Sequence, residues 1–94
     1  MTLSDLMVML RKDLVVGVVD AADPTARGWR YGFHASIRDV ELLKNHLLGG
    51  ETGFGETIIE AIADHCQRIS GQVIVLHPTD PVRRREFNLP VIQP

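Results

Sequence analysis

The stretch Thr57–Leu76, TIIEAIADHCQRISGQVIVL, sets the fold class because it predicts a helix followed at once by a strand. Thr57 and Glu60 have the spacing of a capping box, in which the hydroxyl accepts a hydrogen bond from a first-turn amide. Apolar residues then recur at helical spacing, namely Ile58, Ile59, Ile62, Ala63, Cys66 and Ile69. Ser70-Gly71 ends the helix, and the apolar run Val73–Leu76 is typical of a buried strand. The stretch therefore predicts a mixed α/β protein.

The same start signal predicts two more helices. It occurs at Thr2 with Asp5 and at Ser36 with Asp39. The first signal is followed by an apolar stripe of Leu3, Leu6, Met7, Leu10 and Leu14. The second is followed by a stripe of Ile37, Val40, Leu43, Leu47 and Leu48, before glycines at 49–50 that favour a helix end. We therefore expect helices after Thr2 and after Ser36.

Two further strands complete the predicted order. Leu14–Val19 is a continuous apolar run rich in valine, and Trp29–Ser36 alternates between aromatic or small residues and polar ones. The prediction is an α/β (α+β) fold with a small three- to four-stranded sheet packed by three helices, in the order α-β-β-α-α-β plus a C-terminal tail. Residues 1–80 are expected to form a single α/β domain, and residues 81–94 a C-terminal tail or an extra edge strand.

Composition places the chain among globular proteins. It has 94 residues, 45% of them hydrophobic and 23% charged, and a formal net charge of −2. No apolar run approaches the roughly 18 residues of a membrane span, and the first residues lack the pattern of a secretory signal. The single cysteine, Cys66, cannot form an intrachain disulfide, which fits a reducing compartment. We therefore expect a cytoplasmic protein.

The sequence offers little support for catalysis or for a metal. The four histidines, at positions 34, 46, 65 and 77, lack the spacing of common zinc sites, and no nucleophile elbow occurs. Cys66 lies on the apolar face of its predicted helix, so we expect it to be buried, with His65 on the solvent side. Its neighbours His65 and Arg68 leave an activated thiol as a weaker alternative. We predict no catalytic residue, no metal site and no cofactor, which favours a protein that is not an enzyme.

One motif suggests a nucleic-acid partner. Gly50-Glu51-Thr52-Gly53 is a GxxG loop between two predicted helices, and the predicted order of elements resembles that of the prokaryotic (type II) KH domain. The resemblance implies an RNA-binding protein that uses Gly50, Glu51, Thr52 and Gly53, with the basic cluster Arg83, Arg84 and Arg85. KH loops usually carry a basic residue between the glycines, where this chain has Glu51-Thr52. The stretch from Ile58 to Arg85 is also similar to small ribosome-associated CRM-domain proteins, without their basic glycine loop.

The leading hypothesis is a non-enzymatic intracellular interaction or assembly module, either a homo-oligomer or a small subunit of a larger complex. It depends on the high apolar content and on an apolar tail whose predicted contact residues are Phe87, Leu89 and Val91. Its partner would be a protein or a second copy, with no membrane involved. RNA binding through Gly50–Gly53 and Arg83–Arg85 is the alternative.

Overall fold

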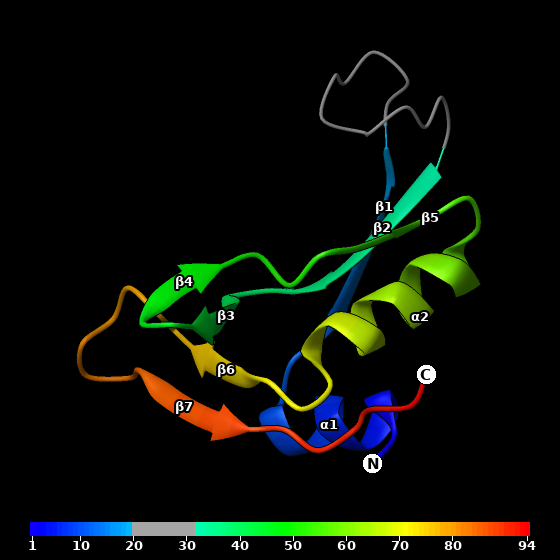
Figure 1. Ribbon diagram of the computed structural model, residues 1–94. Coiled ribbons are helices and arrows are strands. Elements are labelled where there is room, and N and C mark those ends of the chain that lie inside the picture. The colour runs from blue at the N-terminus through cyan, green and yellow to red at the C-terminus, as the bar shows by residue number, and fades with distance from the viewer. Residues whose placement is uncertain (20–31) are drawn as a thin grey trace.

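The computed structural model describes residues 1–19 and 32–94, in which two helices and seven strands form a mixed α/β fold (Figure 1). The helices are α1 (Leu3–Leu10) and α2 (Ile58–Ile69). The strands are β1 (Leu14–Val19), β2 (Gly32–Ile37), β3 (Val40–Lys44), β4 (Leu47–Gly49), β5 (Gly53–Gly55), β6 (Val73–Leu76) and β7 (Arg85–Asn88). Neither helix in these ranges is long and apolar enough to cross a membrane.

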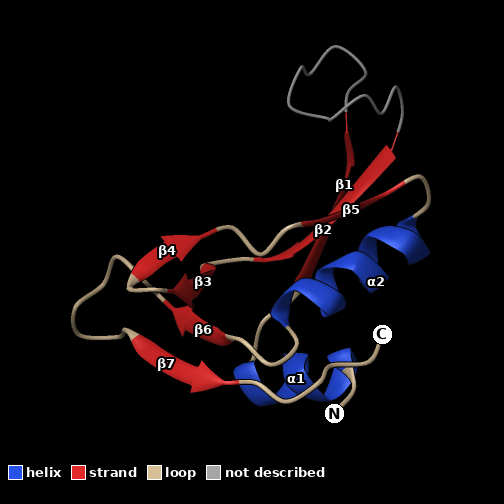
Figure 2. Cartoon of the chain, viewed as in Figure 1, coloured by secondary structure: helices blue, strands red, loops and turns tan. Residues whose placement is uncertain are grey.

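The described strands form two antiparallel sheets. The first has the order β1-β2-β5 and the second the order β4-β3-β6-β7. The chain passes from one sheet to the other between Ile37 and Val40, where Asp39 has a positive φ of 57°. Figure 2 shows α2 alongside the first sheet and α1 near the C-terminal segment. The α2 helix packs on β5 and β2, so that one face of the first sheet is covered.

The predicted helix after Ser36 is wrong, and with it the prediction of three helices and their order. The stretch forms the end of β2 and the hairpin of β3 and β4, in which Lys44 pairs with Leu47. Asn45 and His46, the two residues between the strands, have φ values of 52° and 65°. Two successive left-handed residues form the turn that suits a tight hairpin. Because strand residues two apart share a face, Val40 is buried and Leu42 packs against the core.

The other two predicted helices are present and start where their caps predicted. The Thr2 hydroxyl accepts a hydrogen bond from the Asp5 amide at 3.1 Å, and the Asp5 carboxylate accepts one from the Thr2 amide at 3.4 Å. At α2, the Thr57 hydroxyl accepts from the Glu60 amide at 3.1 Å. Each hydroxyl satisfies an amide that has no partner within its helix.

The predicted strands at Leu14–Val19 and Val73–Leu76 correspond to β1 and β6. The strand predicted from Trp29 is seen from Gly32 onward as β2, whereas Trp29 and Tyr31 lie outside the described residues. Phe33, the third aromatic residue of that pattern, is partly buried.

The main core joins both ends of the chain. It contains buried residues from α1, α2, β6 and the last residues, including Leu6, Ile69, Ile74, Leu89 and Ile92. Gln93 forms a bridge with Thr2, in which its carbonyl accepts from the Leu3 amide at 2.7 Å and its amide donates to the Met1 carbonyl at 2.9 Å. The C-terminal segment is therefore packed against the N-terminal helix of the same chain.

Candidate functional site

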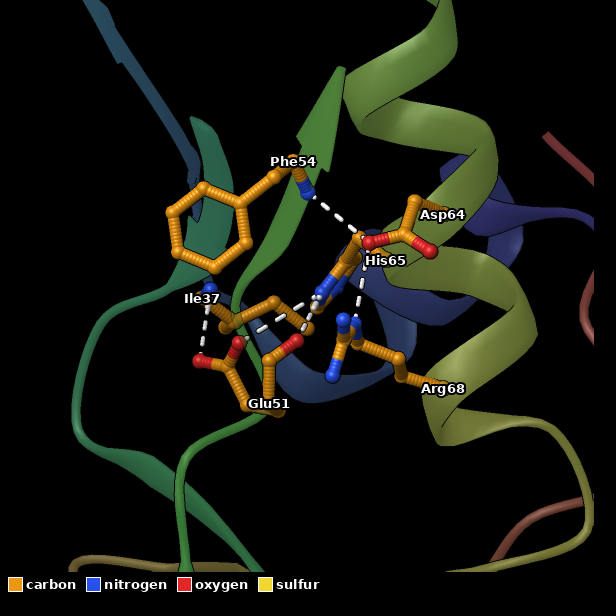
Figure 3. Close-up of polar contacts among 6 residues, drawn as sticks. All are labelled: Ile37, Glu51, Phe54, Asp64, His65 and Arg68. Atoms are coloured by element: carbon orange, nitrogen blue, oxygen red, sulfur yellow. Dashed lines mark hydrogen bonds and ion pairs between the residues drawn. The ribbon is translucent and has the colours of Figure 1, made fainter. Parts of the chain in front are cut away.

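A buried polar pair links β5 and α2. His65, on α2, is fully buried, and Glu51, just before β5, is only 3% exposed (Figure 3). The His65 Nδ1 atom lies 2.7 Å from the Glu51 carbonyl oxygen and 3.4 Å from Glu51 Oε2. A carbonyl oxygen only accepts, so Nδ1 carries the hydrogen of this bond. The Glu51 Oε1 atom accepts from the Ile37 amide at 3.0 Å, which ties the end of β2 to the same pair.

Two glycines let β5 approach α2 closely enough to form this pair. A Cβ atom built on Gly53 would lie 2.2 Å from the His65 backbone nitrogen and 2.5 Å from the Ala61 carbonyl oxygen. A Cβ atom on Gly55 would lie 2.5 Å from the Ala61 nitrogen. These contacts are with helix backbone, which has little freedom to move. The glycines of the loop therefore act here as spacers between a strand and a helix.

A second polar contact fixes the outer side of the same junction. Asp64 Oδ2 accepts from the Phe54 amide at 2.8 Å and from Arg68 Nε at 2.9 Å. Partial burial opposes ionisation of Asp64, but the bonds from Arg68 and from the Phe54 amide outweigh it, so the pKa of this carboxyl lies below its usual value. Asp64 thus bonds β5 to α2, and Arg68 holds the Asp64 carboxylate in position (Figure 3).

The buried pair has no access to a substrate. Glu51 Oε2 and His65 Nε2 are both buried, and neither has a hydrogen-bond partner among the described residues. Across residues 1–19 and 32–94, no three His, Cys, Asp or Glu side chains gather in a way that could hold a metal ion. The geometry therefore supports a role in holding the two elements together. The expectation that His65 faces solvent is wrong, because α2 turns this residue toward β5.

Cys66 is buried next to His65 in the sequence but on the core side of the helix, as predicted. Burial raises the pKa of its thiol, which disfavours the reactive thiolate. Arg68, the neighbour that could have activated it, is bonded to Asp64.

We expect Cys66 in the native protein to resist alkylation by iodoacetamide at pH 8, because the thiol is both shielded and protonated. Addition of denaturant should expose it and allow complete labelling, which mass spectrometry would detect as a single adduct. Rapid labelling of the folded protein would instead indicate an activated thiol and would favour an enzyme.

The residues predicted to bind RNA do not form one surface. The loop Gly50–Gly53 connects β4 to β5 and not two helices, so the order on which the KH resemblance was based is absent. Gly50 is exposed, but Glu51 is bound to His65 and Ile37, and Gly53 lies against α2. Thr52, between them, is partly buried.

The arginine cluster contributes instead to a pocket on another part of the molecule. A cavity of about 430 Å³ lies between the end of α1, the end of β6 and the β7 strand, and we call it the basic pocket. Its polar side chains are all basic: Arg11, Lys12, His77, Arg83 and Arg85. Arg84 is not among the lining residues and lies 3.9 Å from Glu86. No sequence signal links Arg11, Lys12 and His77 to residues 83–85, because only the fold brings them together.

The predicted interaction tail is used largely within the chain. Phe87 pairs with Ile74 in the second sheet and packs against the core, and Leu89 is buried in it. Val91 is 67% exposed, so it is the most open of the three to a partner.

Comparisons of the chain with protein-family models, with curated proteins and with solved structures found no match.

Proposed function

We propose that the protein is a non-enzymatic intracellular interaction module that assembles with a second copy of itself through the outer edge of β1. The observation that supports this most directly is the chemistry of that edge. β1 contains six residues, Leu14–Val19, none of which is charged or proline. In the described part of the chain, β2 is its only hydrogen-bonded neighbour.

The other sheet edges are each protected against pairing with another strand, either by short length or by charged residues. β5 and β4 have only three residues each, and β7 presents the charged residues Arg85 and Glu86. Short strands and charged side chains are the usual means of preventing edge-to-edge pairing. β1 uses neither, so it is the edge best suited to accept another strand.

The side chains of β1 favour a second copy as that strand. Val16 pairs with Ala35, and Ala35 pairs with Gly53. Paired residues of neighbouring strands share a face of the sheet, and Gly53 lies against α2. Val16 and Val18 therefore lie on the face that α2 covers. They are nevertheless 39% and 71% exposed. A two-fold axis would place two uncharged strands antiparallel, with no like charges opposed, and would cover these valines.

We expect the purified protein to have twice the chain mass of 10.5 kDa when measured by light scattering after gel filtration. Val18→Lys should weaken assembly at least tenfold and return the mass to that of one chain at micromolar concentration. Val18 is exposed within one chain, so the variant should keep its circular dichroism spectrum and fold.

Val91→Lys is the matched control, because it adds the same charge to an exposed valine of the predicted interaction tail. It should leave the mass of the assembled protein unchanged. A monomeric wild-type protein, or an assembly broken by Val91→Lys and not by Val18→Lys, would show that β1 is not the interface.

RNA binding stays a prediction with a narrower basis. Of its seven predicted residues, Arg83 and Arg85 share the basic pocket, whereas Glu51 and Gly53 are buried. Single-stranded RNA is therefore one of the ligands to be titrated against the basic pocket.

A further inference from the structure

The basic pocket concentrates positive charge on a chain whose net charge is negative. Arg11, Lys12, Arg83 and Arg85 make up four of the ten arginines and lysines, although the formal net charge is −2. No acidic residue of the described chain lines the pocket, and none forms an ion pair with these four side chains. Their charges are therefore available to a ligand.

Local structure explains why the nearby acids do not neutralise the pocket. Strand alternation places Arg85 and Phe87 on the pocket side of β7, and Glu86 on the opposite side near Arg84. Asp80 Oδ1 accepts hydrogen bonds from the amides of Val82 and Arg83, at 3.0 Å and 3.2 Å, and so caps the turn before β7. Asp13 lines a neighbouring depression beyond Arg11 and Lys12.

Local contacts set the backbone of Arg11 and the side chain of Arg83. Arg11 ends α1 in the left-handed conformation, with φ of 54°, and its amide donates to the last turn of the helix. On the opposite wall, the Arg83 guanidinium nitrogen Nη2 lies 3.4 Å from His77 Nε2. Since the guanidinium only donates, His77 accepts, and this contact orients Arg83.

The pocket also has apolar lining residues, which narrows the class of ligand. Leu10, Leu76 and Phe87 line it together with the basic side chains. The volume of about 430 Å³ falls in the range of small-molecule sites, roughly 300–1,000 Å³. Three arginines offer planar forks that match phosphate oxygens, and four cationic side chains suit a ligand with several negative charges better than a single carboxylate.

We propose that the basic pocket binds a nucleoside di- or triphosphate, with its phosphates among Arg11, Lys12, Arg83 and Arg85 and its base against the apolar lining residues. The phosphate chemistry is shared by two sources, the free nucleotide and the backbone of single-stranded RNA. The volume of the pocket and its apolar lining residues favour the nucleotide. The pocket is lined by α1, β6 and β7, whereas the proposed β1 interface belongs to the first sheet.

Isothermal titration calorimetry at low salt with ATP, with inorganic pyrophosphate and with a ten-nucleotide oligouridine tests the proposal. We expect ATP to bind, pyrophosphate to compete with it, and added sodium chloride to weaken both. Arg85→Gln and Arg11→Gln should each weaken ATP binding at least tenfold. Glutamine keeps the first part of the side chain and removes its charge, and both residues are exposed, so the fold should persist.

Arg84→Gln is the matched control, because it makes the same change of charge between two pocket residues without altering the lining. It should change ATP affinity less than twofold, and the monomeric Val18→Lys variant should bind ATP as the wild type does. Absence of ATP binding, or an equal loss in Arg84→Gln, would overturn the proposal. Binding of oligouridine without ATP or pyrophosphate would also overturn it and identify a polynucleotide as the ligand.

Discussion

Replacement of Gly53 by alanine should destabilise the protein by about 3 kcal/mol, at the upper end of the range for overpacking. The added methyl group would meet the His65 nitrogen, the His65 Cα and the Ala61 carbonyl oxygen at 2.2 to 2.6 Å. All three are backbone atoms of α2, so relief requires the helix to move away from β5. That movement would also lengthen the bond between His65 and the Glu51 carbonyl.

The measurement is urea denaturation followed by circular dichroism at a fixed protein concentration. For a domain of this size, the loss corresponds to a fall of roughly 12–24 °C in Tm. Gly49→Ala is the matched control, since a Cβ atom there would have nothing within 4 Å. We expect it to change stability by less than about 0.5 kcal/mol. Equal midpoints for the two variants would show that β5 does not lie against α2 as described.

Replacement of Glu51 by alanine should cost a comparable amount, about 3 kcal/mol. The change removes the acceptor of the buried Ile37 amide and leaves His65 Nδ1 without the nearby carboxylate. It also opens a cavity between β2, β5 and α2. Glu51→Gln retains an oxygen that can accept from Ile37, so it should cost less, about 1 kcal/mol.

Denaturation of both variants beside Glu56→Ala measures this effect. Glu56 is an exposed carboxylate on the same segment, so its removal should be nearly neutral. The difference in free energy of unfolding between the alanine and glutamine variants reports the combined contribution of the hydrogen bond from the Ile37 amide and of the space that the side chain fills. If Glu51→Ala proved as stable as Glu56→Ala, the carboxylate could not be buried between these elements.

The helices and two of the strands could be predicted because their signals are local. Thr2 and Thr57 each begin a helix with a side chain that bonds to an amide three residues later. The signal at Ser36 failed because the same spacing also fits the end of a strand followed by a turn. The outcome was decided by the left-handed residues Asn45 and His46 and by pairing of β3 with β6, some thirty residues further along the chain.

The candidate sites were largely beyond prediction for the same reason. Glu51 and His65 are 14 residues apart, and nothing in their spacing shows that the strand before the helix folds back on it. The glycines at 53 and 55 indicate a loop, but their role depends on the distance to α2. Arg83 and Arg85 stand out in the sequence as part of a basic run, and their neighbours Arg11 and Lys12 are contributed by the opposite end of the chain.

The bridge between Thr2 and Gln93 has a consequence for biosynthesis. The Leu3 amide, in the first turn of α1, bonds to a carbonyl that is translated some ninety residues later. Leu89 and Ile92, which belong to the same core cluster as Leu3 and Leu6, are likewise translated long after them. The apolar side of the first helix therefore lacks these partners until residues 89–93 have been synthesised, and the main core cannot close before then.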